Sequence, residues 1–411
     1  MKPQNCKFCS SPLDVIFVDL GMSPLANSFL NQEMLNKKEP FYPLRVYICS
    51  KCFLVQLEEF ERPENIFTNY AYFSSFSESW LKHAEKYVDL VTTRFGFNHN
   101  SQVVEIASND GYLLQFFKRK NIPVLGIEPA SNIAKVARNK GISTIEKFFG
   151  TQLATELIEI GKSADLLIGN NVLAHVPNLN DFVSGLKILL KLEGIVTMEF
   201  PHLLRLIQQN QFDTIYHEHF SYFSLMVTQK VFAAHKLEIF DVEELPTHGG
   251  SLRIYVKHEE NNTIDKTKNV SNIIQKEKKF GLDDISIYTD FSRIVKLAKQ
   301  KLREFLFTAK KENKKVVGYG APAKGNTLLN YCEVGVDLIE YTVDRSPYKQ
   351  KLYLPGTHIP IKNPEIIRET KPDYVLILPW NLREEIIEQL NYIRKWNGKF
   401  VVPIPEVKIY S

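Results

Sequence analysis

The stretch that decides the fold of this chain is Ser101-Gln102-Val103-Val104-Glu105-Ile106-Ala107-Ser108-Asn109-Asp110-Gly111. Its first part is a short, mainly apolar run that is typical of a buried strand, and its second part is a turn of small and polar residues. Residues 110–118 then show the pattern of a helix. A strand, a tight turn and a helix in this order predict the first unit of a doubly wound sheet, which binds its ligand at the carboxyl ends of the strands.

The alternation of strands and helices forms two series along the chain. Strands alternating with helices predict a parallel sheet, first around this stretch and again after residue 315. The further strands of the first series are expected at 124–128, 165–170 and 194–200, with an antiparallel pair at 237–245 and 251–257. Those of the second are expected at 315–320, 338–343, 374–378 and 400–403. Apolar residues at helical spacing over 291–309 predict a long amphipathic helix between the two series.

The N-terminal residues differ from both series. Four of the five cysteines stand in two Cys-x-x-Cys pairs, Cys6 with Cys9 and Cys49 with Cys52. Two such pairs supply a tetrahedral set of four thiolates, which predicts one structural zinc ion with no open position. Two disulfides or free thiols are the alternative, which a reducing compartment disfavours. The zinc is expected to stabilise a segment too small to have a large core of its own.

Composition narrows the class of protein. The 411 residues correspond to two or three domains at about 150 residues each. A net charge of +4 over this length gives no reason to expect nucleic-acid or membrane binding. The first residues lack the apolar core of a secretory signal, so we expect a cytoplasmic protein.

The turn that follows the first strand predicts the cofactor. It lacks the GxGxxG fingerprint of dinucleotide sites, and Glu128 ends the next strand, where an acid can bind two ribose hydroxyls. Asn170 and Asn171 end the following strand over the same crevice. An acidic, small-residue turn followed by an acid suits S-adenosylmethionine (SAM); a strand–helix turn without ligand is the alternative.

Residues 211–225 form the densest polar and aromatic cluster. A histidine beside a carboxylate and a phenol suits abstraction of a proton next to a carbonyl group, and the cluster contains Tyr216-His217-Glu218-His219. His217 and His219 as metal ligands, or as hydrogen-bonded structural histidines, are the alternatives. His175 is open to the same alternatives.

The second series opens on Gly318-Tyr319-Gly320-Ala321-Pro322-Ala323-Lys324-Gly325-Asn326-Thr327, before a helix expected at 328–331. A glycine-rich turn at a helix N-terminus with a lysine in it suits phosphate oxygens, although it is not a P-loop. Arg345, after the next strand, suits a sugar hydroxyl or a phosphate. A Rossmann-like domain that binds nothing is the alternative.

Taken together and in this order, these segments resemble the zinc-containing, SAM-dependent sugar C-methyltransferases of deoxysugar biosynthesis, of the type that acts at C-3 in tetronitrose formation. The resemblance covers nearly the whole chain. It includes the cysteine pairs, the 105–111 turn, Asn170 to His175, Tyr216 to Tyr222, His248 to Arg253 and the 318–327 turn. One position departs from it, since Ala107 stands where relatives often have glycine.

The resemblance implies a monomer of three parts: a zinc-binding domain (1–68), a Rossmann-like class I SAM methyltransferase domain (69–260), and a helical linker with a C-terminal Rossmann-like nucleotide-sugar-binding domain (261–411). It implies His219 as catalytic base, with Tyr216, Glu218 and His175 beside it. The implied SAM contacts are Tyr70, Tyr72, Ser75, Glu105, Ala107, Ser108, Asn109, Gly111, Glu128, Pro129, Asn170 and Asn171. The implied substrate contacts are Tyr222, Gly250, Ser251, Arg253, Lys324, Asn326 and Arg345.

The expected reaction is methylation at C-3 of a nucleotide-diphosphate 4-ketosugar: His219 removes the C3 proton, Tyr216 stabilises the enolate, and C3 attacks the SAM methyl group. Three rivals stay open: a methyltransferase acting on oxygen, nitrogen or C-5; a nicotinamide oxidoreductase; and a zinc-knuckle adaptor without catalysis. The sequence leaves the sugar, its nucleotide (dTDP or GDP), the C3 substituent and the stereochemistry undecided.

Overall fold

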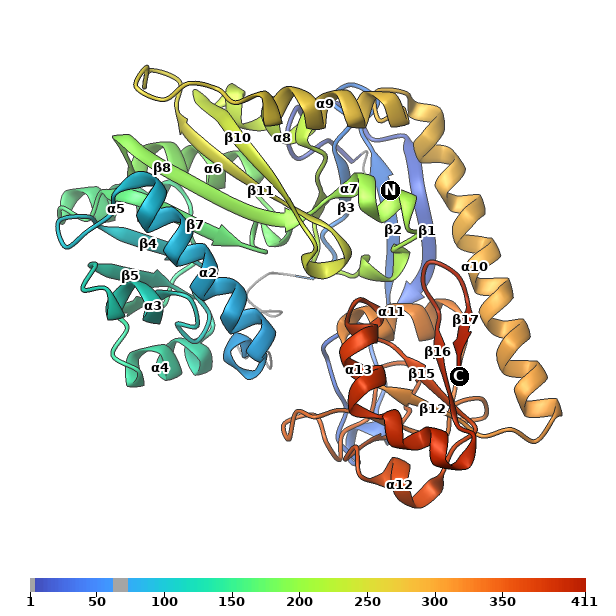
Figure 1. Cartoon of the computed structure of the whole chain (residues 1–411). Coiled ribbons are helices and arrows are strands. Elements are labelled where there is room, and N and C mark those ends of the chain that lie inside the picture. The colour runs from blue at the N-terminus through green and yellow to red at the C-terminus, as the bar shows by residue number, and fades with distance from the viewer. Residues whose placement is uncertain (1–3, 62–72) are drawn as a thin grey trace.

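A computed structural model describes residues 4–61 and 73–411, and three sheets form the framework of this part of the chain (Figure 1). The predicted Tyr70 and Tyr72 lie outside the described residues. Among the described helices, none has the length and apolar composition needed to cross a bilayer.

The central sheet is the doubly wound sheet that the sequence predicts. Its seven strands have the order β10-β11-β8-β7-β4-β5-β6. Their bounds are β4 (Val103–Ile106), β5 (Val124–Ile127), β6 (Thr144–Ile145), β7 (Ala164–Asn170), β8 (Leu190–Pro201), β10 (Leu237–Leu245) and β11 (Ser251–His258). The strands from β6 to β8 are parallel, and β11 is antiparallel to both of its neighbours. The strand order reverses between β4 and β7, so their carboxyl ends form the crevice where such sheets bind ligands.

Helices cover both faces of this sheet. Apolar side chains of α2 (Glu78–Phe95) and α3 (Leu114–Arg119) pack on one face. The other face is covered by α5 (Thr151–Glu159), α6 (Leu179–Leu189), α8 (Leu225–Ala234) and α9 (Lys268–Phe280). At the edge formed by β5 and β6 lies α4 (Ser131–Asn139). Apolar cores therefore cover both faces of the sheet, and the edge at the carboxyl ends of its parallel strands is left for a ligand-binding site.

The N-terminal sheet is completed by a segment far away in the sequence. It pairs β1 (Val15–Ser23), β2 (Tyr42–Ile48) and β3 (Val55–Leu57) with β9 (Ser221–Tyr222), in the order β1-β2-β3-β9. Its other support is α10 (Ile285–Lys311), which runs past β1 towards the C-terminal sheet (Figure 1). Phe17 and Phe291 stack there with ring centroids 4.7 Å apart. This small sheet thus gains a core from α10 and from the C-terminal part of the chain.

The C-terminal sheet has the order β14-β13-β12-β15-β16-β17, parallel except for the last strand. Its strands are β12 (Val316–Tyr319), β13 (Thr342–Val343), β14 (Ile361–Lys362), β15 (Tyr374–Ile377), β16 (Lys399–Val402) and β17 (Lys408–Tyr410). Its helices are α11 (Ala323–Tyr331), α12 (Ile366–Thr370) and α13 (Arg383–Gln389). The predicted second Rossmann-like fold is therefore present.

Two helices begin at residues other than those predicted. The first, α3, begins at Leu114 rather than at residue 110, because Asn109 and Gly111 have φ values of +48° and +75° that a helix excludes. The other, α11, begins at Ala323 and takes Lys324 and Asn326 into its first turns. Pro322 occupies its N-cap, and Gly325 is required there because a Cβ would lie only 3.0 Å from Leu378. The sequence alone placed these residues in a loop because glycine is a poor helix former.

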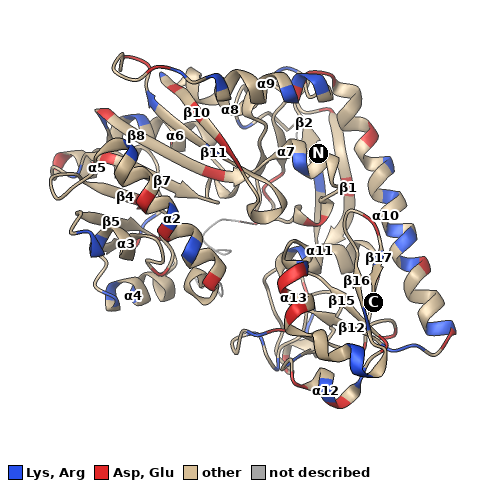
Figure 2. Ribbon diagram, in the orientation of Figure 1, with Lys and Arg blue, Asp and Glu red and all other residues tan. Residues whose placement is uncertain are grey.

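The linker helix α9 is fastened to the central part of the chain through one buried carboxylate. Glu277 accepts hydrogen bonds from the backbone amides of Leu225 and Met226, at 2.6 and 2.9 Å, and so caps α8. The same carboxylate also contacts His202, with Nε2 2.7 Å from Oε1, the oxygen that accepts from Leu225. Figure 2 shows that Lys and Arg recur along the following helix, α10, whose buried face is apolar.

Candidate active site and zinc centre

The four N-terminal cysteines converge on one point. All four Sγ atoms lie within 4.8 Å of one another. The pairs Cys6–Cys52 and Cys9–Cys49 have Sγ atoms 3.5 Å apart, too far for a disulfide bond of about 2.05 Å. A zinc tetrahedron with bonds of about 2.3 Å has edges of about 3.8 Å, so the donor set and its size fit zinc. The alternative of two disulfides is wrong.

A neighbouring glutamine supports the thiolates. Gln56 Nε2 donates to Cys6 Sγ at 3.2 Å, and its Oε1 accepts from the backbone amide of Lys7 at 2.8 Å. The first knuckle is also held by α6, where Asn180 Nδ2 donates to the carbonyl oxygen of Phe8 at 3.0 Å. The sequence analysis missed Gln56, because its role depends on how β3 pairs and leaves no local pattern.

The turn after β4 has an unusual backbone. Ala107, Asn109 and Gly111 all have positive φ, at +54°, +48° and +75°. This left-handed conformation costs a residue with a Cβ roughly 1 kcal/mol, which explains why glycine is favoured at the position of Ala107. The turn is stabilised by Asn109, whose backbone amide donates to Glu128 and whose Oδ1 accepts from the amide of Ser74.

Two carboxylates beside this turn, Glu105 on β4 and Glu128 after β5, have raised pKa values. Burial raises the pKa of Glu105 well above its ordinary range, and the nearby Glu128 and Asp110 raise it further. Burial also raises the pKa of Glu128 to about 7, against the opposing effect of hydrogen bonds from the amides of Ala130 and Asn109, at 2.9 and 3.0 Å. A crevice with buried carboxylates favours a cationic ligand, as the sulfonium and ammonium groups of SAM would be.

Several polar atoms around the turn are suited to a ligand. Within the described residues, Ser108 Oγ, Asn170 Oδ1 and Asn171 Oδ1 are buried without a hydrogen-bond partner. Such atoms are rare unless a ligand or water satisfies them. Ser75 hydrogen-bonds Asp110 beside them, and Pro129 follows Glu128 before α4. The residues predicted from the SAM pattern therefore lie together, and they fit SAM.

The polar and aromatic cluster lies next to this crevice. His219 is 8% exposed, and its ring centroid is 4.0 Å from that of Tyr216 and 4.7 Å from that of His175. Its Nδ1 is 2.9 Å from the carbonyl oxygen of Thr214. Burial lowers the pKa of His219 well below its ordinary value, and His175 lowers it further. Burial likewise lowers the pKa of His175 to about 4, so both imidazoles are neutral at pH 7.

The other members of the cluster have different surroundings. Glu218 Oε1 accepts from Asn27 Nδ2 at 2.7 Å, and Tyr222 is buried in β9. His217 faces away from His219 and contacts the carbonyl oxygen of Pro43 at 3.2 Å through Nε2. Within the described residues, the only cluster suited to a metal ion is that of the four cysteines, so the metal alternative for His217 and His219 gains no support.

The predicted substrate residues of the β10–β11 hairpin are engaged within the protein. Arg253 is buried and donates to Glu199 at 2.9 Å and to Glu243 at 3.1 Å. Ser251 Oγ donates to the carbonyl oxygen of Thr247 at 3.0 Å. Gly250 has a φ of +119°, and a Cβ there would lie 2.7 Å from Arg205. These bonds hold the hairpin in shape, while Arg253 Nε is buried without a hydrogen-bond partner among the described residues.

The C-terminal part brings a lysine to the same region. Lys324 hydrogen-bonds Asn381, and its Nζ lies 4.4 Å from the ring centroid of Trp380. Trp380 in turn donates to Asp213 Oδ2 at 2.6 Å. Burial lowers the pKa of Lys324 to about 8, partly offset by Asp213. This group joins α11 to the segment just before the catalytic cluster.

The other two residues predicted as substrate contacts in the C-terminal part, Asn326 and Arg345, have different surroundings. Asn326 donates to the carbonyl oxygen of Ala26 at 2.5 Å and is buried, while Arg345 is exposed, with Glu385 3.7 Å away. Lys349 was missed by the sequence analysis; it donates to the carbonyl oxygen of Ala321 at 2.8 Å. Nothing in the local sequence distinguishes Lys349 from the many surface lysines of this chain.

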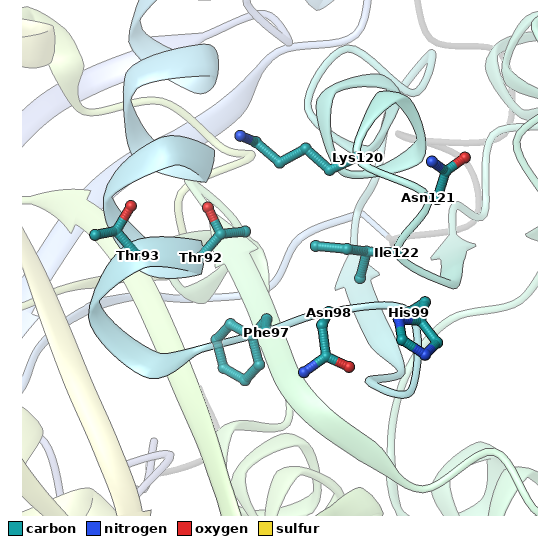
Figure 3. Close-up of a pocket in the computed structure, with 8 residues that line it drawn as sticks. All are labelled: Thr92, Thr93, Phe97, Asn98, His99, Lys120, Asn121 and Ile122. Carbon is teal, nitrogen blue, oxygen red and sulfur yellow. The ribbon is translucent and has the colours of Figure 1, made fainter.

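A surface depression of about 410 Å³ lies elsewhere, between the end of α2 and the segment before β5 (Figure 3). Its lining includes Asn98, His99 and Ile122. These residues precede β4 and β5, so the depression is at the amino ends of the strands, away from the crevice. Lys120, which also lines it, is paired with Asp89 at 2.8 Å.

Comparison with known proteins agrees with this arrangement. Three family models match successive parts of the chain: a zinc binding domain at residues 6–67, a methyltransferase domain at 80–239 and a C-methyltransferase C-terminal domain at 246–405. The C-methyltransferase NovU of Streptomyces niveus is 34% identical over 99% of this chain and 97% of its own length. The chain belongs to the C-methyltransferase family. The predictions of a SAM-dependent methyltransferase, of a SAM cofactor and of a four-cysteine zinc site are thereby confirmed.

Solved structures with partial similarity to this C-methyltransferase include a SAM-dependent methyltransferase from Anabaena variabilis ATCC 29413, with 19% identity and a TM-score of 0.36 over 44% of this chain and 86% of that chain. Another is the magnesium protoporphyrin IX methyltransferase from Synechocystis PCC 6803 with bound SAM, with 14% identity and a TM-score of 0.33 over 43% and 78%. The fold assignment rests instead on the strand order and the family models.

The raised pKa of Glu128 predicts that the affinity for SAM depends on pH. Because the pKa of Glu128 is raised to about 7, its carboxyl becomes protonated below that pH, and a neutral acid is a weaker acceptor for ribose hydroxyls. We expect the Kd for SAM, measured by calorimetry, to rise as pH falls below 7, by up to about tenfold per pH unit. Glu128→Gln should remove this dependence, whereas Glu156→Gln on the exposed side of α5 should keep it. An unchanged profile in Glu128→Gln would assign the titration to another group.

Proposed function

We propose that this C-methyltransferase methylates C-3 of a nucleotide-linked (dTDP or GDP) 4-keto-deoxysugar and makes a branched-chain sugar. The observation that carries the proposal is the contact between His219 Nδ1 and the carbonyl oxygen of Thr214. A carbonyl oxygen only accepts, so Nδ1 carries the proton and Nε2 keeps its lone pair. A neutral imidazole with a fixed, unprotonated nitrogen is the group that a general base requires.

The acceptor chemistry follows from this base. A carbonyl group acidifies the hydrogen on the neighbouring carbon, and His219 Nε2 takes that proton. The phenol of Tyr216 and the imidazole of His175 are proposed to stabilise the enolate oxygen, which their rings support by lying against that of His219. SAM, when bound, supplies an electrophilic methyl group on a sulfonium centre. The role of the chain is then to hold the enolate carbon towards it, since alignment supplies much of the rate.

The cofactor contacts are proposed at the carboxyl ends of β4, β5 and β7. The turn from Glu105 to Gly111 approaches SAM with its backbone, and Glu128 accepts from the ribose hydroxyls. Asn170, Asn171, Pro129 and Ser75 complete the pocket. Tyr70 and Tyr72 are proposed on the resemblance to the family alone.

The nucleotide is proposed to bind at the C-terminal sheet. The turn from Gly318 to α11 lies against the catalytic cluster, because Thr327 Oγ donates to the carbonyl oxygen of Ile215 at 2.9 Å. A diphosphate here would meet Lys324, with Arg345 at the exposed end. We propose the division 1–68, 69–260 and 261–411 for zinc, SAM and nucleotide sugar, in a monomer.

Product analysis tests this proposal. The purified protein is incubated with carbon-13-methyl SAM and either a dTDP-linked or a GDP-linked 4-keto-6-deoxyhexose, and the product is examined by NMR. We expect the labelled methyl group to couple through carbon to C-3. A label on C-5, on oxygen or on nitrogen would contradict the proposal and point to one of its rivals.

A further inference from the structure

The hairpin between β10 and β11 presents one side chain to the crevice that the proposed mechanism does not use. His248 lies at its tip with φ at +53°, a left-handed conformation that few residues other than glycine adopt, although histidine, like asparagine and aspartate, adopts it more often than most. Such strain persists only where the surroundings hold the backbone in place, and it gathers at functional sites. The neighbouring turn residues show what holds it: a Cβ on Gly249 would lie 2.6 Å from the ring of Trp380.

The ring of His248 is held between Asn171, which follows β7, and Trp80 of α2. Its Nε2 is 3.2 Å from Nδ2 of Asn171, at the carboxyl end of β7, and its ring contacts that of Trp80 edge-on with centroids 5.2 Å apart. The amide nitrogen of asparagine only donates, so Nε2 accepts and the ring proton is on Nδ1. The imidazole is thus held as a hydrogen-bond donor through Nδ1.

Burial and the charges of neighbouring residues keep the imidazole of His248 neutral. Burial lowers its pKa to about 4, and Lys324 and His83 lower it further while Glu199 opposes them. His248 is close enough to His219 to contribute to the lowered pKa of that proposed base. A neutral donor beside the base does not compete with it for a proton, which is what an oxyanion-stabilising group requires.

We propose that His248 is a further substrate-binding residue of this methyltransferase, whose Nδ1–H donates a hydrogen bond to the acceptor oxygen on which charge develops. This inference rests on the proposed function, because it assumes an enolate. It assigns to the turn, which is held by Asn171 and by the packing of Trp380 against Gly249, the role of directing one donor into the crevice.

Hydrogen exchange at the acceptor carbon tests the inference without methyl transfer. In D2O and without SAM, His219 removes the C3 proton, solvent exchanges it, and a deuteron returns to C3, which mass spectrometry detects. We expect His248→Gly to lower the exchange rate of a dTDP-linked or GDP-linked 4-keto-6-deoxyhexose by about 10²-fold, the loss typical of one oxyanion donor. Glycine accepts the positive φ, so the hairpin should be kept.

Two substitutions of equal size, His248→Asn and His248→Asp, separate the loss of the hydrogen-bond donor from the change in side-chain shape. Asparagine and aspartate have the same size and both tolerate the left-handed conformation, but only asparagine can donate. We expect His248→Asn to stay within about tenfold of the native exchange rate and His248→Asp to lose about as much as His248→Gly. SAM affinity, measured by calorimetry, should be unchanged in all three. Because two variants lack the donor, failure of one to fold leaves the other to decide.

His358 supplies the control for the substitution itself. It also has a positive φ, at +56°, and it lies in the C-terminal part, beside Glu39. His358→Asn should exchange at the native rate. Native-like exchange in His248→Gly or His248→Asp would overturn the role of His248. Absence of exchange in the native protein would instead contradict the proposed function, so the two failures can be told apart.

Discussion

Replacing His219 with asparagine is expected to lower the rate of methyl transfer by about 10³-fold, the range of a general base. The asparagine Nδ2 can keep the hydrogen bond to the carbonyl oxygen of Thr214, so the change removes the basic Nε2 and little else. SAM affinity should stay close to that of the native protein. Steady-state kinetics with a nucleotide 4-ketosugar, together with calorimetry for SAM, measures both quantities.

His217 is the control for this variant, because it lies two residues away in the same run and contacts the carbonyl oxygen of Pro43 instead of the catalytic cluster. His217→Gln keeps a donor at that position and should retain nearly full activity. If His219→Asn keeps activity within tenfold of the native protein, the base is another residue, and Tyr216 is the next candidate. With SAM at saturating concentration, the activity of the native protein should also persist well below pH 6.5, because the pKa of His219 is lowered.

Replacing Cys49 with serine is expected to remove the zinc and to destabilise the N-terminal sheet. Zinc binding contributes about 10 kcal/mol or more in zinc-finger peptides, so losing one of four ligands should lower the unfolding midpoint by roughly 10 °C or more. The effect should spread to the methyltransferase part, because Cys6, Cys49 and Cys52 belong to the same apolar core as β4, α6 and α8. Metal analysis and calorimetric unfolding measure the two changes.

Cys332 provides the matched control. It is the fifth cysteine and is fully buried after α11, far in sequence from both knuckles. Cys332→Ala should keep one zinc per chain and lose stability only through the small cavity that it creates. If Cys49→Ser retained stoichiometric zinc, the four-thiolate site would be contradicted.

Local patterns predicted most of the framework. The strand at 103–106 and its turn, the parallel series on both sides of α10 and the two cysteine pairs all depend on residues that are neighbours in the sequence. Where the prediction failed, the deciding contact was distant: α11 begins five residues before the expected start, and Gly325 in its first turn packs against Leu378, which follows β15.

The candidate site shows the same division. The residue pattern by itself predicts a base within Tyr216-His217-Glu218-His219 without distinguishing the two histidines, and the resemblance to the family points to His219. Only the fold places His217 against β2 and His219 against His175. Likewise, the resemblance to the family predicts Arg253 as a substrate contact, and only the pairing of β11 with β8 places it beside Glu199.

The sequence by itself therefore determined the zinc ligands and the strand–turn–helix unit that fits SAM, and it predicted the polar and aromatic cluster at residues 211–225, because each depends on spacing along a few residues. The tertiary structure decided which polar groups are already satisfied and which are left for a ligand. It brought Asn171, His219 and His248 from three separate segments to one crevice, and it completed the zinc-bearing sheet with β9. Those contacts join residues far apart in the chain, and only the order of strands in the sheets determines which of them meet.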